Sequence, residues 1–303
     1  MSYRFKKRET VRAGIRRIAR EQIDEAMELL RDKKADSEEV VHEARKHFKK
    51  VRALLRLVRD NLGEEVYQSA NGTVRTLGRR LAPARDASVL VSALERLRSA
   101  YEKDFPAEKV APIQKRLVSR RRATLGRLRR DRTLSKIARE LEPLRQHVRV
   151  WALGQEGFPC VEPGLRRVYR QGRKAQPQAY ATRTDEAFHE WRKRAKDLRY
   201  HVELLQPVWP DTMKVLEKEL HDLTDCLGND HDFAELRRML AATPGLEEPG
   251  SGVAAVVELI DRRRSELQSK AGPIGALTYS EKPRAFSRRI ESYWEAWRFR
   301  PEE

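Results

Sequence analysis

The sequence predicts an all-α protein built by internal duplication, with two helical halves related by a pseudo-twofold axis. Three observations lead to this prediction. Apolar residues recur at helical spacing along nearly the whole chain, and no segment alternates convincingly as a strand would. A basic helix motif occurs twice, about 147 residues apart. The segments around the motif repeat in the same order, so each half is expected to form one helical bundle.

The repeated motif occupies residues 42–58, HEARKHFKKVRALLRLV, and residues 189–205, HEWRKRAKDLRYHVELL. Aligned without gaps, the copies share His42/His189, Glu43/Glu190, Arg45/Arg192, Lys46/Lys193, Lys49/Lys196 and Arg52/Arg199. On a helix, the cations of the first copy fall on one side together with Arg56, roughly opposite Phe48, Val51 and Leu55. One face therefore packs into a core, and the other is basic.

The basic face has two interpretations. A solvated surface is the simpler one, but solvated faces mix charge signs to limit repulsion, and this face is almost purely cationic. The residue types also repeat position by position in two distant segments. The pattern therefore favours a binding surface for a polyanion, with the two cationic helices facing a shared central groove.

Composition agrees with that interpretation. The chain has 303 residues, 39% of them hydrophobic, so it can form a core, and its net charge of +18 favours nucleic acid, polyphosphate or an anionic membrane surface as partner. The two cysteines give no disulfide framework and indicate a reducing compartment. The basic N-terminus leads into no apolar signal segment, and no apolar run is long enough to span a membrane.

The first repeat is predicted to cover residues 1–154. Its helices are expected at about 10–34, with Thr10 as N-cap, then at 37–61 with Gly63 as a stop, 64–81, 86–97, 107–130 and 134–153. Pro83 is expected to end the third of these helices, and Asp86 to cap the fourth.

The second repeat is predicted to cover residues 155–303, after a Gly- and Pro-rich linker at 154–164. Helices are expected at about 185–206, 210–227, from 232 onward, 253–270 and 284–298, with a loop at 243–252. Residues 227–232 (LGNDHD) align with 81–86 (LAPARD), so Asp232 is expected to cap a helix as Asp86 does.

These motifs resemble the CHAD family, the conserved histidine α-helical domain. The resemblance is carried by His-x-x-Arg-Lys-x-x-Lys in both halves, by LAPARD and LGNDHD, and by Tyr169-Arg170-x-Gly172-Arg173. Ala82 departs from the glycine usual in the first turn motif. The resemblance implies two pseudo-symmetric four-helix bundles around a basic central channel that binds inorganic polyphosphate. It also implies a binding module rather than an enzyme, here in a stand-alone form without a CYTH triphosphate-tunnel domain.

The candidate polyphosphate contacts form two groups. A linear polyanion is matched by rows of cations, lysine as a point charge and arginine as a planar fork of donors. The first group is Arg45, Lys46, Lys49, Arg52, Arg56, Arg192, Lys193, Lys196 and Arg199. The second is Arg16, Arg20, Arg75, Arg79, Arg166, Arg170, Arg173 and His221. For each, solvation or an ion pair with a neighbouring carboxylate is the competing interpretation.

The histidines and acids of the motifs have other expected roles. His42 and His189 are predicted to contact phosphate when protonated, or else to hold the helix by hydrogen bonds. Asp86 and Asp232 are predicted to be structural caps, and Glu43 and Glu190 to orient a neighbouring cation. No catalytic residue, metal or cofactor is expected.

Two alternatives stay open. Metal-dependent phosphohydrolysis would use the acids and histidines of residues 221–232, namely His221, Asp222, Asp225, Asp230, His231 and Asp232. A nucleic-acid-binding protein would stack bases on Tyr200, Trp191 or Trp151, although aromatic and basic residues are not interleaved. Non-specific affinity for nucleic acid is expected in either case. The expected location is the cytoplasm, in association with polyphosphate granules.

Overall fold

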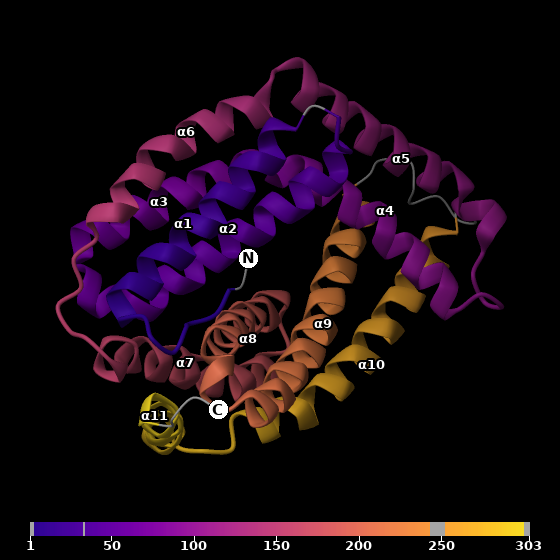
Figure 1. Cartoon of the computed structure of the whole chain (residues 1–303). Helices are drawn as coiled ribbons and strands as arrows, with labels where there is room; N and C mark the ends of the chain where they lie inside the picture. Colours follow the sequence, from indigo (N-terminus) through magenta and orange to yellow (C-terminus); the bar gives the residue numbers. More distant parts are fainter. Residues whose placement is uncertain (1–2, 33, 243–251, 300–303) are drawn as a thin grey trace.

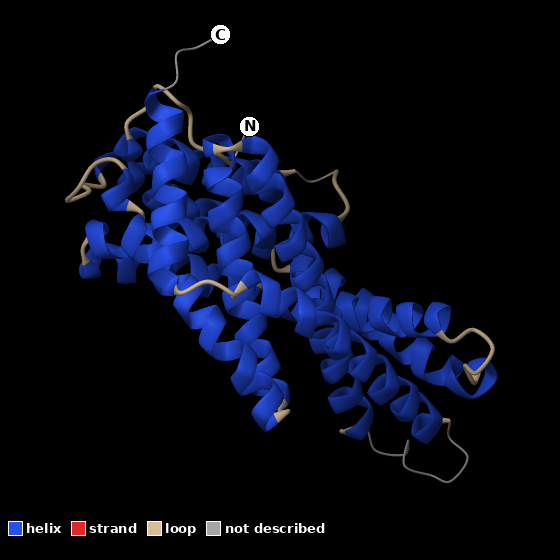
Figure 2. Ribbon diagram, turned by 90° about the horizontal axis from the view of Figure 1, so that it is seen from below, coloured by secondary structure: helices blue, strands red, loops and turns tan. Residues whose placement is uncertain are grey.

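The computed structural model describes residues 3–32, 34–242 and 252–299, and all regular secondary structure in these ranges is helical (Figure 2). The α-helices are α1 (Val11–Arg31), α2 (Ser37–Leu62), α3 (Glu64–Arg80), α4 (Ala82–Ala100), α5 (Ala107–Arg130), α6 (Thr133–His147), α7 (Glu162–Thr182), α8 (Asp185–Leu205), α9 (Pro210–Ala241), α10 (Val253–Thr278) and α11 (Pro283–Phe299). Short 3₁₀ helices are η1 (Val148–Val150), η2 (Phe158–Cys160) and η3 (Gln206–Val208). The predicted all-α class is confirmed. None of the described helices meets the length and apolarity that a bilayer crossing requires.

Polar side chains fix where several helices begin. The Thr10 hydroxyl accepts a hydrogen bond from the Ala13 amide at the start of α1, as predicted. Asp36 does the same for Glu39 at the start of α2. Thr184 caps α8, so both basic helices begin close to the predicted positions. Gly63, whose φ is +85°, ends α2 in the conformation that glycine adopts most easily.

The prediction that Asp86 and Asp232 are N-caps is wrong. α4 begins at Ala82, before Asp86, because Pro83 occupies a first-turn position where no backbone N–H is needed. Asp232 lies within α9, which continues unbroken from Pro210 to Ala241. Residues 227–232 contain no proline, and one glycine lowers helix stability without ending a helix.

Other boundaries differ from the prediction in smaller ways. The helices expected at 210–227 and from 232 onward are one helix, α9. α6 ends at His147 and passes into η1, and α10 runs on to Thr278. The predicted loop at 243–252 lies outside the described residues except for its last position.

The buried apolar residues form two clusters. The larger one draws mainly on α1, α2, α3, α6, α7, α8, α11 and the first half of α9, and the smaller one mainly on α4, α5, α10 and the second half of α9. Each cluster includes residues from both sides of position 154. The predicted units 1–154 and 155–303 therefore do not each have a hydrophobic core of their own. That the two units are repeats of one another stays a prediction.

Four helices, α4, α5, α9 and α10, contribute buried residues to both clusters. Leu128 of α5 and Ala271 of α10 lie in the larger cluster, whereas the other buried apolar residues of these two helices lie in the smaller one. In α4, Ala84 belongs to the larger cluster and Leu90 to the smaller. In α9, Leu227 belongs to the larger cluster and Phe233 to the smaller. The two motifs that align in the sequence, 81–86 and 227–232, therefore lie where the chain crosses between the clusters. Figure 1 shows α9 leading from the α8 side of the molecule toward α4.

The basic helices α2 and α8 contact each other through their C-terminal halves. His201 Nε2 lies 2.9 Å from the Ala53 carbonyl oxygen, and Arg56 pairs with Asp197 at 3.0 Å. α7 also crosses α2 closely, because a Cβ at Gly164 would lie 1.9 Å from the Leu57 carbonyl oxygen. These contacts involve the C-terminal turns of α2, where the cation Arg56 pairs with α8.

Candidate anion-binding site

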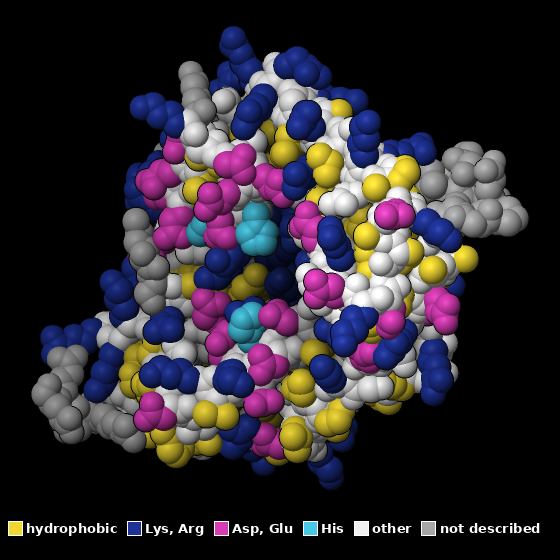
Figure 3. Space-filling model, turned by 90° about the vertical axis from the view of Figure 1, so that its right-hand side faces the viewer, with side chains coloured by type: hydrophobic (Ala, Val, Ile, Leu, Met, Phe, Trp, Pro, Cys, Tyr) yellow, Lys and Arg dark blue, Asp and Glu magenta, His cyan; other side chains and the backbone are white. Residues whose placement is uncertain are grey.

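Two adjoining pockets open beside the N-terminal turns of α2. The first, of about 590 Å³, lies between α2, α8 and α9, and the second, of about 610 Å³, between α4, α5, α8 and α9. Arg45, Lys49 and Arg85 line both pockets, and we call these three the shared cations. The face in Figure 3 is hollowed, with Lys and Arg side chains in the depth of the hollow and carboxylates and imidazoles around it.

Both pockets are strongly cationic. Besides the shared cations, the first pocket is lined by Arg4, Lys46, Lys50, Lys196 and Arg199. The second adds Arg120, Arg192 and Arg238. Carboxylates are also present, namely Glu203, Glu217 and Asp225 in the first pocket and Asp86, Asp232 and Glu235 in the second. Whether a cation is free to bind a ligand therefore depends on its partners.

The cations at the centre form no ion pair with any carboxylate that the structure describes. Among the described residues, Lys49, Arg85, Arg192 and Lys196 make no ion pair, and the guanidinium of Arg45 donates instead to the Gly78 carbonyl oxygen at 2.6 Å. Nε of Arg45 is buried without a hydrogen-bond partner, and so is Nε of Arg192. Such donors are available to an anion that enters the pockets.

Crowding lowers the pKa values of these groups. Burial, followed by the charges of Lys196 and Arg192, lowers the pKa of Lys49 well below its ordinary value. Burial, then Arg192 and Arg199, lowers the pKa of Lys196 to about 8. Burial is also the main cause of the lowered pKa values of Arg45 and Arg192. An anion between these groups would relieve both their repulsion and their desolvation.

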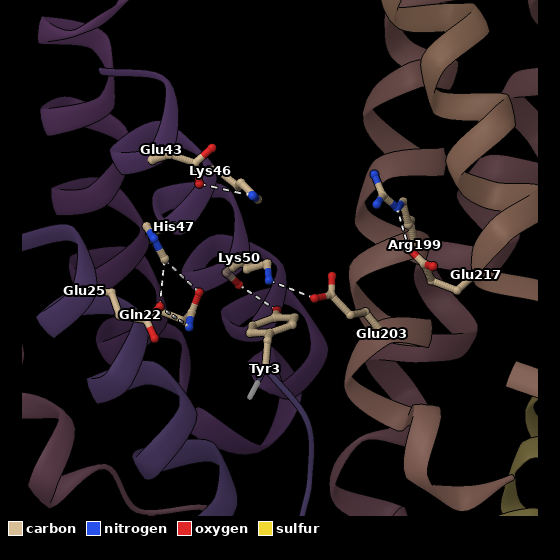
Figure 4. A network of polar contacts seen from close by, with 10 residues as sticks. All are labelled: Tyr3, Gln22, Glu25, Glu43, Lys46, His47, Lys50, Arg199, Glu203 and Glu217. Carbon is tan, nitrogen blue, oxygen red and sulfur yellow. Dashed lines mark hydrogen bonds and ion pairs between the residues drawn. The ribbon is translucent and has the colours of Figure 1, made fainter. Parts of the chain in front are cut away.

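The cations around the centre are paired. Lys46 Nζ lies 3.1 Å from Glu43, and Lys193 pairs with Glu190 at the equivalent position of α8. Figure 4 shows the Lys46 pair on α2, the contact of Lys50 with Glu203 across to α8 at 2.8 Å, and the contact of Arg199 with Glu217 at 2.8 Å. Each of these cations already has an anionic partner.

Three of the first-group residues, Arg52, Arg56 and the paired Lys193, line neither pocket. Arg52 donates from Nε to the Asn71 side chain at 3.0 Å, and burial followed by the Arg56 charge lowers its pKa to about 10. Arg56 pairs with Asp197. Arg52 and Arg56 belong to the turns of α2 that pack against α3 and α8, so the sequence repeat extends beyond the part of the helix that lines the pockets.

Of the second group, His221 lines one of these two pockets, the first, where its Nδ1 lies 3.3 Å from Asp225. The others make local contacts or are exposed on α1, α3 and α7, as follows: Arg16 donates to the Trp151 carbonyl, Arg20 pairs with Asp24, Arg166 pairs with Glu162, Arg173 donates to the Tyr279 carbonyl, and Arg75, Arg79 and Arg170 are exposed. The predicted set is therefore divided between the pockets and the outer surface.

The two motif histidines lie in different pockets. His42 lines the first pocket beside Glu43, with burial and then the Arg85 charge lowering its pKa. His189 lines the second pocket, where its ring centroid is 4.2 Å from that of His231. Burial and the charge of Arg192 lower the pKa of His189, and burial, then His189, lowers that of His231 to about 3. Burial and the neighbouring cations therefore favour the neutral form of both motif histidines.

Arg85 is the main residue that sequence reasoning missed. It lies in the quoted motif LAPARD, but the interpretation of that motif rested on Asp86 as a cap. As a helix residue of α4, Arg85 lines both pockets, and its charge contributes to the lowered pKa values of Arg45, Lys49 and Lys196. The signal was present, because arginine stands directly beside the aspartate in a repeated motif.

The acids and histidines proposed for the phosphohydrolase alternative face different partners. His221 pairs with Asp225, Asp230 with Arg264 at 3.0 Å, and Asp232 with Arg96 at 2.9 Å. Within the described part of the chain, no three His, Cys, Asp or Glu side chains are grouped as metal ligands. The alternation of partners follows from helix α9, which directs successive residues to different faces.

The aromatic residues of the nucleic-acid alternative do not form a stacking platform. Trp151 and Trp191 are buried, with relative exposures of 2% and 0%, and pack in the larger cluster. Tyr200 lines the first pocket but is also buried. Base stacking would need exposed ring faces, which these residues do not present.

Comparison with known proteins identifies relatives. A family model described as the CHAD domain matches residues 15–241. The uncharacterized proteins MT2285 and Rv2226 of Mycobacterium tuberculosis, from strains CDC 1551 / Oshkosh and ATCC 25618 / H37Rv, are each 29% identical over 197 residues. The alignments cover 61% of this chain, and the chain spans only 38% of the length of either relative.

The fold is similar to that of a solved structure. PptA from Streptomyces chartreusis matches with a TM-score of 0.66 and 15% identity, over 90% of this chain and 100% of that one. The CHAD domain from the plant Ricinus communis has a TM-score of 0.45 and 17% identity, over 93% of this chain and 90% of that one.

Proposed function

Because this chain belongs to the CHAD domain family, we propose that it binds inorganic polyphosphate without hydrolysing it, in a channel formed by the two adjoining pockets. The observation that carries the proposal is the set of shared cations, Arg45, Lys49 and Arg85, which line both pockets and have no carboxylate partner among the described residues. A polymer bound to these three residues could extend into both pockets.

The chemistry of the lining suits a linear polyanion. Arginine forks can engage two oxygens of a phosphate, and lysines supply point charges between them. α2 contributes Arg45 and Lys49, and α8 contributes Arg192 and Lys196, the matching members of the duplicated motif. In this proposal the duplication places equivalent cations of the two helices along one polymer, about a pseudo-twofold axis.

The proposal extends to the lack of catalysis. Two carboxylates of the lining face cations, since Asp232 pairs with Arg96 and Glu217 with Arg199. A polymer held at the shared cations would therefore meet donors rather than a general base. Association with polyphosphate granules in the cytoplasm is part of the same proposal.

The proposal is tested by calorimetric titration with polyphosphate of defined length, in parallel with RNA. We expect saturable binding that is tighter for polyphosphate, with log affinity falling steeply and linearly against log salt as counterions are released. Affinity that does not change between low and physiological salt would contradict binding by a row of cations.

A second measurement separates binding from hydrolysis. Polymer length is measured after incubation with Mg²⁺ and, in a matched sample, with a chelator. We expect unchanged length in both samples. Shortening that requires the metal would replace the binding proposal by the phosphohydrolase alternative, and preference for RNA in competition would replace it by nucleic-acid binding.

A further inference from the structure

Helix α5 carries a cationic surface that the proposed site does not explain. From Lys109 to Arg130 the sequence contains no Asp or Glu. The same segment carries Lys109, Lys115, Arg116, Arg120, Arg121, Arg122, Arg127, Arg129 and Arg130. An acid-free stretch of this length is unusual for a solvated helix, which normally mixes charge signs.

Only two of these cations are paired with acids of the described residues. Arg121 lies 3.6 Å from Glu38, and Arg129 lies 3.9 Å from Asp36 at the start of α2. These contacts attach one side of α5 to α2. Arg116, Arg120 and Arg127 are exposed and have no ion pair within the described ranges.

These three arginines lie on one flank of α5. At about 100° per residue they fall within about 40° of one another around the helix axis. The first and last are about 17 Å apart along that axis, at about 1.5 Å per residue. We call this row the α5 flank. Lys115 and Arg122, also exposed, fall on roughly the opposite side of the same helix.

The middle residue of the α5 flank connects it to the second pocket. Arg120 is the residue of α5 that lines this pocket, together with the shared cations and Arg192. A polymer that leaves the second pocket past Arg120 would meet Arg116 in one direction along the helix and Arg127 in the other. Figure 1 shows α5 as an outer helix beside α4, at the periphery of the fold.

We propose that the α5 flank is an additional polyphosphate surface, which holds the part of a long chain that extends beyond the second pocket. This inference rests on the proposed function. It predicts that chain length determines affinity: a short polyphosphate held in the pockets does not reach Arg116 or Arg127, whereas a long chain contacts them.

The test uses the full chain with Arg116→Ala/Arg127→Ala, titrated with tripolyphosphate and with long-chain polyphosphate. Arg120 stays unchanged because it lines the pocket. The matched control is Lys115→Ala/Arg122→Ala, which removes the same charge from the opposite side of α5. Melting temperature, measured for both variants, identifies any loss of folding.

We expect the flank variant to bind long chains about tenfold more weakly, with a salt slope reduced by about one for each lost contact. Its affinity for tripolyphosphate should stay within about twofold of wild type, and the control variant should match wild type for both ligands. Equal losses in the flank and control variants would show a general charge effect and overturn the inference, as would an unchanged affinity for long chains.

Two outcomes separate this inference from the function on which it rests. If the wild-type protein binds neither polyphosphate, the proposed function fails. If the wild-type protein binds both, and the flank variant loses affinity only for single-stranded RNA, the pocket proposal stands and the α5 flank is a nucleic-acid surface instead.

Discussion

The repeated motif contains two kinds of lysine that are alike in sequence and different in structure. We call Lys49 and Lys196 the inner lysines, and Lys46 and Lys193 the outer lysines. Lys49 and Lys196 lie in the pockets, with no carboxylate partner in the part of the chain that the structure describes, and their pKa values are lowered. Lys46 and Lys193 stand three residues earlier on the same helices, and each pairs with the glutamate three residues before it. Helical periodicity places all four on one basic face. The two kinds of lysine differ in whether a carboxylate pairs with them, and helical periodicity does not predict that difference.

The difference matters for binding energy. An exposed ion pair contributes little, and its cation already has a counter-charge. A buried cation without a partner carries a desolvation penalty that an incoming anion can offset. We therefore expect the inner lysines to dominate affinity although the outer ones are more accessible, with relative side-chain exposures of 50% for Lys46 and 48% for Lys193.

The largest expected effect comes from neutralising the inner lysines. Lys49→Ala or Lys196→Ala should weaken polyphosphate binding roughly 10- to 100-fold, the range expected for losing one or two hydrogen bonds to a charged group. Lys46→Ala and Lys193→Ala are the matched controls and should stay within about threefold. Titration calorimetry of the four variants measures the loss of polyphosphate affinity at each position. Equal losses at the inner and outer lysines would contradict the prediction.

The same titrations report on whether the two helices share one polymer. In a shared channel, Lys49→Ala and Lys196→Ala each keep the wild-type stoichiometry and lose affinity. Two independent sites would instead leave half the stoichiometry at nearly wild-type affinity, and the repeat would then have no joint role in binding. Removing an unpaired buried cation should not lower the melting temperature, so misfolding can be recognised.

The inner lysines also make binding depend on pH. Lys196 faces Lys49 of α2, Arg85 of α4, Arg192 and Arg199 of α8, and Asp225 of α9, and its pKa is about 8. Polyphosphate favours the charged form and raises this pKa, so binding takes up protons. Affinity should then fall by up to about tenfold per pH unit between pH 8 and pH 10.

Calorimetry in two buffers of different ionisation enthalpy measures the proton uptake directly. Lys196→Arg is the matched variant, because arginine stays charged throughout this range and should flatten the pH dependence. The stability of the free protein should depend on pH in the opposite direction to the affinity. The folded pKa of Lys196 lies below its unfolded value, so its contribution should raise the free energy of unfolding as pH rises from about 8 to about 10.4. An unaltered pH profile in Lys196→Arg would contradict this assignment.

The sequence was sufficient for the fold class and for most helix boundaries. Apolar periodicity and the caps at Thr10 and Gly63 are local signals, and local signals place helices. The crossings of α4 and α9 between the two clusters were not predictable from such signals. They depend on which distant helices pack together, and this packing brings Asp86 and Asp232 to the second pocket.

The site was predicted only in part for the same reason. Arg45, Lys49, Arg192 and Lys196 were identified because the motif repeats, and the structure brings them to adjoining pockets. Arg56 was predicted from its place on the same helical face, but it pairs with Asp197, a residue 141 positions away. No single-sequence pattern reports such a long-range partner.

The smallest expected effect concerns the two aspartates, and it separates their roles as caps and as pocket residues. Asp86 and Asp232 line the second pocket, and Asp86 lies near Arg45, since its charge acts on the pKa of that arginine. Asp→Asn at either position removes a negative charge from the pocket while keeping the side-chain shape. At separations of several ångströms in a partly hydrated site, this should raise polyphosphate affinity by about threefold.

The expected change in stability is small, because a partly exposed pair such as Asp232 with Arg96 contributes at most about 1 kcal/mol. Asp222→Asn is the matched control on α9: Asp222 pairs with Lys218 and lines neither pocket, so its loss should leave affinity unchanged. Caps would behave in the opposite way, with stability lowered by about 0.5–2 kcal/mol and affinity unaltered. Titration and thermal melting of the three variants distinguish the two patterns. An affinity that rises at positions 86 and 232 but not at 222 would identify these carboxylates as groups that weaken anion binding in the second pocket, set against the unpaired cations of α2 and α8.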